Sequence, residues 1–119
     1  MPDKNIEAEI QAKGLNAPRV TPADIEAAIS LEWYFTAADG ARSAYYAGHQ
    51  DRPGDDSPLH LLTFCVLVLD NGFTVTGESA CASPENFDAE IGRKIARQNA
   101  VAKIWPLLGF RLRDKLAAG

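Results

Sequence analysis

The sequence has few of the residues that most often perform catalysis or hold metal ions. Its 119 residues include two cysteines, two histidines and one methionine. Cys65 and Cys81 lie too far apart for the paired spacing of a zinc site, and two thiols cannot make a disulfide scaffold. A catalytic nucleophile needs an activating base, yet His49 and His60 lie in or beside a turn-rich segment. We therefore expect a protein that is not an enzyme and that uses no metal or cofactor.

Long apolar runs and a basic, hydrophobic start are lacking as well. No window approaches the ~20 apolar residues of a membrane-spanning helix. Residues 1–13 are polar and acidic, unlike a secretory signal. These features predict a cytoplasmic protein with no membrane partner.

Positive charge is scarce overall but is concentrated near the C-terminal end. The net charge of -4 makes the chain a poor nonspecific binder of nucleic acid. Residues 83–119, however, carry seven basic and four acidic side chains, a balance of +3, so the first 82 residues carry -7. An anionic ligand is therefore expected to bind near the C-terminal third.

Strand and turn signals predict one α+β domain over residues 21–119, preceded by a flexible tail over residues 1–20. Thr21 and Pro22 are typical of the cap and first turn of a short helix. Residues 31–36, 61–70 and 73–79 are rich in β-prone side chains and predict an antiparallel three-stranded meander. Turn-forming residues predict a long exposed loop over residues 41–58. We expect a long C-terminal helix to pack on this sheet.

Asn71 and Gly72 give a strong hairpin signal, because a two-residue type I′ turn needs positive φ at both central positions. Placing Asp70 opposite Phe73 divides the hairpin into two faces. The face expected to pack on the helix comprises Phe64, Val66, Val68, Phe73 and Val75. The other face comprises Thr63, Cys65, Leu67, Leu69, Thr74, Thr76 and Glu78, and it is a candidate oligomer surface.

The C-terminal helix is expected to begin at Ser83 and Pro84, to end or kink at Pro106 and to have Gly109 as a C-cap. Helical spacing predicts an apolar core stripe formed by Phe87, Ile91, Ile95, Gln98, Ala102 and Trp105. Arg93 and Arg97 lie one turn apart beside Lys94. They either grip phosphate oxygens or belong to a solvated face on which Glu90 pairs with a basic neighbour.

Residues 61–107 contain a set of short motifs: Asn71-Gly72-Phe73, Ser79-Ala80-Cys81, Pro84-Glu85-Asn86-Phe87-Asp88, Gly92, Lys94, Ala96, Ala100 and Trp105. With these motifs the segment resembles a family of small proteins encoded by tailed phages and prophages. The family that it resembles is identified as one that includes the Thoeris anti-defence proteins. Those proteins hold the glycocyclic ADP-ribose signal made by host TIR enzymes without cleaving it, and some also bind cyclic oligonucleotides. The resemblance implies a homo-oligomer, from dimer up to hexamer, in the bacterial host cytoplasm.

The resemblance further implies that the chain sequesters a cyclic nucleotide immune signal in a pocket shared between subunits. Such a ligand suits paired arginines, an aromatic face and amide groups. The candidate ligand-binding residues are Phe87, Arg93, Arg97, Asn99, Asn86 and Lys94. The long loop departs from the compact members, which leaves the identity of the ligand open. The alternative is a phage accessory protein that binds a host protein through its sheet face and basic helix.

Overall fold

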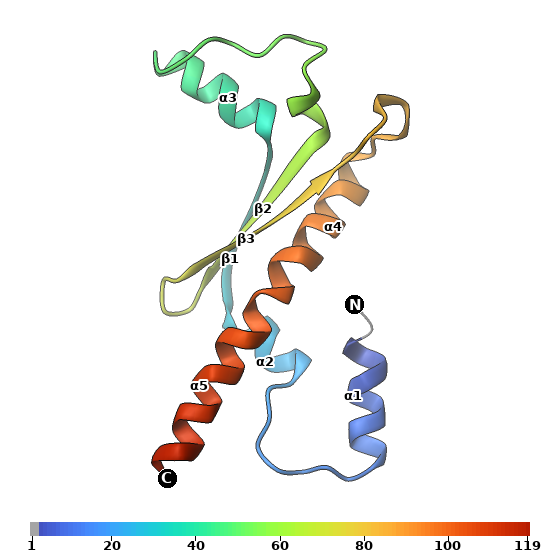
Figure 1. The fold of residues 1–119 in the computed structure, drawn as a ribbon, viewed down its shortest axis with the longest axis vertical. Helices are drawn as coiled ribbons and strands as arrows, with labels where there is room; N and C mark the ends of the chain where they lie inside the picture. The colour runs from blue at the N-terminus through green and yellow to red at the C-terminus, as the bar shows by residue number, and fades with distance from the viewer. Residues whose placement is uncertain (1–2) are drawn as a thin grey trace.

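An antiparallel sheet of three strands in the order β1-β2-β3 forms the centre of the molecule, and one long helix crosses it (Figure 1). The computed structural model describes residues 3–119. Its elements are α1 (Asp3–Ala12), α2 (Pro22–Ala28), β1 (Ile29–Thr36), α3 (Ala37–Tyr46), β2 (Leu62–Leu69), β3 (Thr74–Ala80), α4 (Ala89–Ala102) and α5 (Ile104–Ala118), with short 3-10 turns at Pro58–Leu61 and Pro84–Asn86. The predicted α+β class and the meander are confirmed.

The N-terminal half contains two more helices than expected, α1 and α3. The predicted start of α2 is confirmed, because Thr21 and Asp24 form a reciprocal capping box. Thr36 and Asp39 form the same arrangement at the start of α3. The helix α3 therefore occupies residues that were expected to lie in the loop, and the irregular segment begins at Ala47. Residues 3–12 form α1, whose Glu7 is bonded to Arg19; the division of the chain at residue 20 stays a prediction.

The register of the β2–β3 hairpin differs from the prediction by one residue. Leu67 lies opposite Val75, and the amide of Leu69 donates to the carbonyl of Phe73. The loop therefore has three residues, and within it only Gly72 has positive φ, at 86°. A three-residue loop with a left-handed glycine is the next most common hairpin connection after the two-residue turn. The predicted type I′ turn is wrong, although the tight turn itself is present.

This shift reverses the predicted faces of β2, because side chains alternate along a strand. The helix-covered face holds Thr63, Cys65, Leu67 and Leu69, together with Val75 from β3. Phe64, Val66 and Val68 point to the opposite face and are only partly buried. The expectation that Val75 packs under the helix is correct, and the expectation for Phe64 is wrong.

The helix α4 begins later than predicted and buries a different stripe. Ser83 and Pro84 start a 3-10 turn, whereas Asp88 caps α4 through the amide of Ile91. The buried positions of α4 are Gly92, Ala96 and Ala100. The predicted core residues Ile91 and Ile95 are instead 56% and 42% exposed. Small side chains face the sheet because the helix backbone approaches β3 too closely for large ones.

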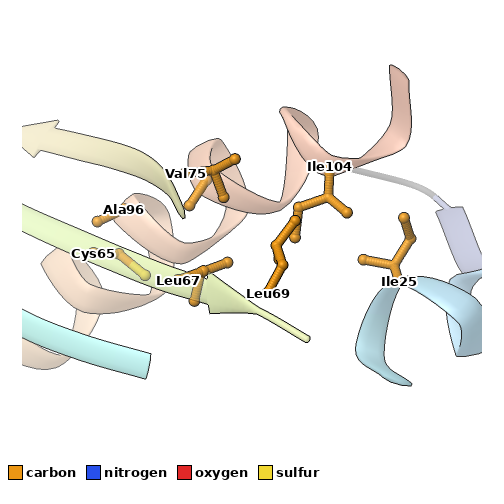
Figure 2. Packing of buried hydrophobic residues seen from close by; sticks show 8 residues of the cluster. Ile25, Cys65, Leu67, Leu69, Val75, Ala96 and Ile104 are labelled. Atoms are coloured by element: carbon orange, nitrogen blue, oxygen red, sulfur yellow. The ribbon is translucent and has the colours of Figure 1, made fainter. Parts of the chain in front are cut away.

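The hydrophobic core lies between the sheet, α4, the start of α5 and α2 (Figure 2). Its buried members are Ile25, Cys65, Leu67, Leu69, Val75, Ala96, Ala100 and Ile104. A break at Lys103 separates α4 from α5, and Pro106 lies in the first turn of α5, as its missing amide proton allows. The predicted interruption near Pro106 is thus confirmed, but the predicted C-cap at Gly109 is wrong, because α5 continues to Ala118.

Candidate functional site

A groove lies between β1 and α4 on the helix-covered side of the sheet. The register places Glu32, Tyr34 and Thr36 of β1 opposite Leu67, Cys65 and Thr63, which all lie on that side. Because α4 packs on β2 and β3, it leaves the adjoining surface of β1 uncovered. We call this region the β1–α4 groove and define it by Tyr34, Phe87, Arg93, Lys94 and Arg97.

Two small hollows make up the groove. One, of about 100 Å³, is lined by Tyr34, Thr63, Phe87 and Arg93 among others. The other, of about 240 Å³, is lined by Tyr34, Glu90, Arg93, Lys94 and Arg97. Tyr34 and Arg93 line both hollows. An aromatic ring and a guanidinium group therefore stand at the centre of the groove.

Arg97 was expected to be an exposed ligand-binding residue, but it is half-buried and bound by two carboxylates. Its Nε and Nη2 atoms donate to Glu32 at 2.9 and 3.2 Å. Its Nη2 and Nη1 atoms donate to Glu26 at 2.9 and 3.2 Å. Forked bonds of this kind are stronger than neutral ones. We call this cluster the Arg97 clamp; it joins α4 to α2 and β1, and its two carboxylates outweigh the single positive charge of Arg97.

The clamp changes the ionisation of the groups around it. The hydrogen bond from Arg97 lowers the pKa of Glu32 below its ordinary value of 4.5. Burial raises the pKa of Tyr34, and the bond that its hydroxyl donates to Glu32, at 2.8 Å, raises it further. Tyr34 is therefore a neutral phenol. Glu32 is an ionised carboxylate whose oxygens already accept hydrogen bonds from Arg97 and Tyr34.

The Arg97 clamp is expected to make stability depend on pH. Folding lowers the pKa of Glu32 below its ordinary value of 4.5. The ion pair of Glu32 with Arg97 therefore stabilises the fold fully above pH 4.5, and this stabilisation is lost as the pH falls through the lower pKa of the folded state. We expect Glu32→Gln to be less stable than the parent by on the order of 1 kcal/mol at pH 7, because the pair is partly exposed. This difference should shrink on acidification to pH 3. Thermal melts between pH 3 and pH 7 measure it.

The matched control for this prediction is Glu90→Gln. Glu90 pairs with Lys94 at 3.3 Å, and both side chains are largely exposed. Such a pair adds little to stability, so this variant should melt like the parent at every pH. A Glu32→Gln deficit that stays constant with pH would contradict the account of the clamp.

The remaining predicted ligand residues are spread over different surfaces. Arg93 lines the groove, and among the described residues no hydrogen bond or ion pair engages its guanidinium. Lys94 pairs with Glu90, as the alternative interpretation of this helix face predicted. Asn99 faces β3, where its Nδ2 donates to the carbonyl of Glu78 at 2.8 Å. Asn86 is exposed in the 3-10 turn before α4. The structure thus brings Phe87, Arg93 and Lys94 together with Arg97, but not with Asn99.

Sequence reasoning missed three residues of the site: Tyr34, Glu26 and Glu32. The alternation of side chains along β1 could have indicated two of these residues, because Glu32 and Tyr34 share a face of the strand. The ion pairs join positions that are 71 and 65 residues apart. No local pattern marks such pairs, so only the fold shows that Arg97 has acidic partners.

Cys65, which lies opposite Tyr34 in the sheet, is not an activated nucleophile. Burial raises the pKa of Cys65, so its thiol stays protonated. The His60 ring lies 3.1 Å from the carbonyl of Gly54, in the turn-rich segment. Within residues 3–119 there is no group of acidic, histidine or cysteine side chains that could hold a metal ion. The arrangement suits binding by hydrogen bonds, charge and aromatic contact.

A larger hollow, of about 690 Å³, lies between α2, α5 and the β2–β3 turn. Its charged lining residues are Arg19, Arg111, Lys115, Asp24, Asp70 and Asp114. Its lining contains no aromatic side chain, whereas Tyr34 and Phe87 line the β1–α4 groove. It is therefore a poorer candidate than the groove for a ligand that carries a base as well as phosphate.

Comparison with known proteins places the chain among phage proteins. No helix in the part of the chain that the structure describes is long and apolar enough to cross a bilayer. No curated protein and no solved structure matches the chain significantly. A family model, however, matches residues 20–116, which include the whole sheet, the β1–α4 groove and the Arg97 clamp. The chain therefore belongs to the phage protein (N4 Gp49/phage Sf6 gene 66) family.

Proposed function

We propose that the protein binds a cyclic nucleotide immune signal in the β1–α4 groove and withholds it without cleaving it. The ligand class is a glycocyclic ADP-ribose or a cyclic oligonucleotide. One observation carries the proposal: Arg93 has no partner among the described residues and lines both hollows beside Tyr34. An unpaired guanidinium next to an aromatic ring is suited to a ligand that carries both phosphate and a base.

Different side chains of the groove suit the phosphate and the base of such a ligand. Arg93 would donate forked hydrogen bonds to phosphate oxygens, and Lys94 would add charge at the rim. Tyr34 or Phe87 would contact the adenine ring. Arg97 would support the groove indirectly, because Glu26 and Glu32 already use its donors. Asn86 and Asn99 lie outside the groove of a single chain, so a role for them requires a second chain.

The small hollows favour an assembly over a single chain. Pockets that enclose a small ligand usually measure ~300 to 1,000 Å³, and the larger hollow of the groove has about 240 Å³. One chain would therefore enclose only part of a cyclic dinucleotide. A homo-oligomer, from dimer up to hexamer, is part of the proposal.

Membership in a phage family is consistent with this kind of protein. A phage protein that acts by binding a host signal would work in the host cytoplasm, and it would need no catalytic group. The neutral Tyr34 phenol and the protonated Cys65 thiol are poor nucleophiles. These features support sequestration over hydrolysis of the signal.

A release experiment tests the proposed function. Purified protein is incubated with a glycocyclic ADP-ribose or a cyclic oligonucleotide, unbound ligand is removed, and the protein is then denatured by heat. We expect the free signal to disappear on incubation and to return intact, by mass spectrometry, after heating. Recovery of a cleaved product would indicate an enzyme. No depletion by any cyclic nucleotide would favour the alternative, a protein that binds a host protein.

A further inference from the structure

Side-chain oxygens line one side of the smaller hollow of the β1–α4 groove. They belong to Thr36, Asp39 and Thr63, whereas Arg93 lines the hollow from α4. Thr36 and Thr63 are register partners across β1 and β2. Asp39 lies in the first turn of α3, which follows β1 directly (Figure 1). Hydrogen-bonding groups of the strands and of α3 therefore meet a cationic group of α4 at this hollow.

Thr63 contributes a buried hydroxyl to the hollow. The residue is only 4% exposed, and among the described residues no hydrogen bond engages its hydroxyl. Such a group is costly unless a polar partner binds it. Gly92 leaves the space beside it open, because a Cβ atom there would lie 3.0 Å from Oγ1 of Thr63 and 4.0 Å from Cε1 of Phe87. The hydroxyl thus lies close to an aromatic wall of the hollow and is free to bond a ligand.

Asp39 supplies an acceptor to the same hollow. Its Oδ2 accepts from the amide of Thr36 at 2.9 Å, as part of the capping box of α3. Its Oδ1 lies 3.9 Å from Nη1 of Arg42, which is beyond hydrogen-bond distance. One oxygen of the carboxylate therefore has no hydrogen bond within residues 3–119. Because the carboxylate accepts but does not donate, it suits a hydroxyl group and disfavours a phosphate.

A free ribose hydroxyl matches these two groups. A 2′-hydroxyl both donates and accepts a hydrogen bond, so it can donate to Asp39 and accept from Thr63. The hollow of about 100 Å³ has the liquid volume of roughly three water molecules, which admits the edge of a sugar but not a whole purine ring. Dinucleotide-binding folds also use a carboxylate to bind the ribose 2′-hydroxyl. Arg93 lines both hollows, so a phosphate bound by it would adjoin the sugar.

We infer that the smaller hollow binds the free 2′-hydroxyl of a ribonucleotide ligand, with Asp39 as acceptor and Thr63 as donor. This inference rests on the proposed function, and it narrows the ligand class to cyclic nucleotides that contain ribose rather than deoxyribose. The larger hollow then receives phosphate and base. A site built to bond a hydroxyl rejects the analogue that lacks it, because the polar groups of the site are left unpaired.

Ligand-observed NMR titrations with adenosine 5′-monophosphate test this inference, because the probe carries one phosphate, one ribose and one base. We expect 2′-deoxyadenosine 5′-monophosphate to bind more weakly by about tenfold or more, since a bond to a charged group is lost. Inosine 5′-monophosphate, which differs only at the edge of the base, should bind like the adenosine probe. Equal affinity for the ribose and deoxyribose probes would overturn the inference.

Thr63→Val shows whether the buried hydroxyl makes this distinction. Valine suits a strand and removes a hydroxyl that has no partner, so the variant should melt no lower than the parent. It should bind the ribose and deoxyribose probes with equal affinity. The control Thr76→Val changes an exposed residue of β3 and should keep the parent ratio of affinities. A Thr63→Val protein that keeps this ratio would contradict the role of Thr63.

Asp39→Ala tests the acceptor, and Asp24→Ala is its matched control. Each substitution removes the acidic member of a capping box, at α3 and at α2, so both variants should melt below the parent by similar amounts. Only Asp39→Ala should lose the preference for the ribose probe. Loss of the preference in both variants, or in neither, would overturn the assignment of Asp39.

The release experiment separates this inference from the proposed function. A protein that returns an intact cyclic nucleotide after heating, but binds the two adenosine probes equally, would keep the proposed function and lose the inference. A protein that returns the cyclic nucleotide but binds neither probe at millimolar concentration would have the same consequence. A protein that prefers the ribose probe but depletes no cyclic nucleotide would keep the 2′-hydroxyl site and lose the proposed function.

Discussion

Replacing Gly77 with alanine is expected to destabilise the fold strongly. A Cβ atom at this position would lie 2.1 Å from the carbonyl oxygen of Ala96 and 2.3 Å from the amide nitrogen of Ala100. Both are backbone atoms of α4, so no side-chain rotation can relieve the clash. Overpacking a core costs typically 1 to 3 kcal/mol and occasionally more, and here the whole helix has to move away from β3. We expect a loss of about 3 kcal/mol or more, measured by denaturant unfolding.

Gly109→Ala is the matched control for this change. Gly109 lies within α5, a Cβ atom added there would meet no other atom within 4 Å, and its φ is not positive. Alanine is favoured over glycine in a helix by roughly 0.5 to 1 kcal/mol, so this variant should match or exceed the parent in stability. A Gly77→Ala protein as stable as the parent would show that α4 does not approach β3 as closely as described.

The hydrophobic pattern could predict that α4 packs on the sheet, but not which face it buries. Ile91 and Ile95 have the helical spacing of a core stripe, yet they are exposed. Ala96 and Ala100 are fully buried because Gly77 lets the helix backbone approach the strand. A prediction from hydrophobicity alone places large apolar side chains in the core. Where the helix backbone lies against a strand, however, only small side chains fit between them.

The hairpin shows a similar limit at the level of register. Asn71 and Gly72 indicate a turn, and the turn is there. Two-residue and three-residue loops both accept this dipeptide, and they differ by one position in the pairing of β2 with β3. A one-residue difference exchanges the two faces of a strand. The sequence therefore predicts the hairpin, whereas the identity of the buried face depends on the packing of α4.

The candidate site could be predicted only in part for a related reason. Arg93 and Lys94 follow from the basic face of one helix, which is a local pattern. The partners of Arg97 come from α2 and β1, and no local sequence pattern predicts these pairs. The sequence treats Arg93 and Arg97 as equivalent, but the fold makes Arg97 a structural residue and leaves Arg93 available for a ligand.

Because of this difference, Arg93→Ala is the substitution in the β1–α4 groove that best separates an effect on ligand binding from an effect on stability. Charge-assisted hydrogen bonds contribute ~1.5 to 3 kcal/mol, and about 1.4 kcal/mol corresponds to a tenfold change in affinity. We therefore expect Arg93→Ala to weaken binding of the cyclic nucleotide by at least tenfold. Because Arg93 is exposed, its removal should change the free energy of unfolding by only about half a kcal/mol. Arg113→Ala removes the same charge from exposed α5, outside the groove, and should keep the parent affinity.

Calorimetric titration of Arg93→Ala with the cyclic nucleotide that the parent binds, beside a thermal melt of the same sample, shows whether the ligand binds in the β1–α4 groove. We expect a melt like that of the parent together with an affinity at least tenfold lower, while Arg113→Ala retains both. Parent-like affinity in Arg93→Ala would place the ligand outside the β1–α4 groove and contradict the account. A collapsed melt would contradict it as well, because Arg93 would then be a structural residue like Arg97.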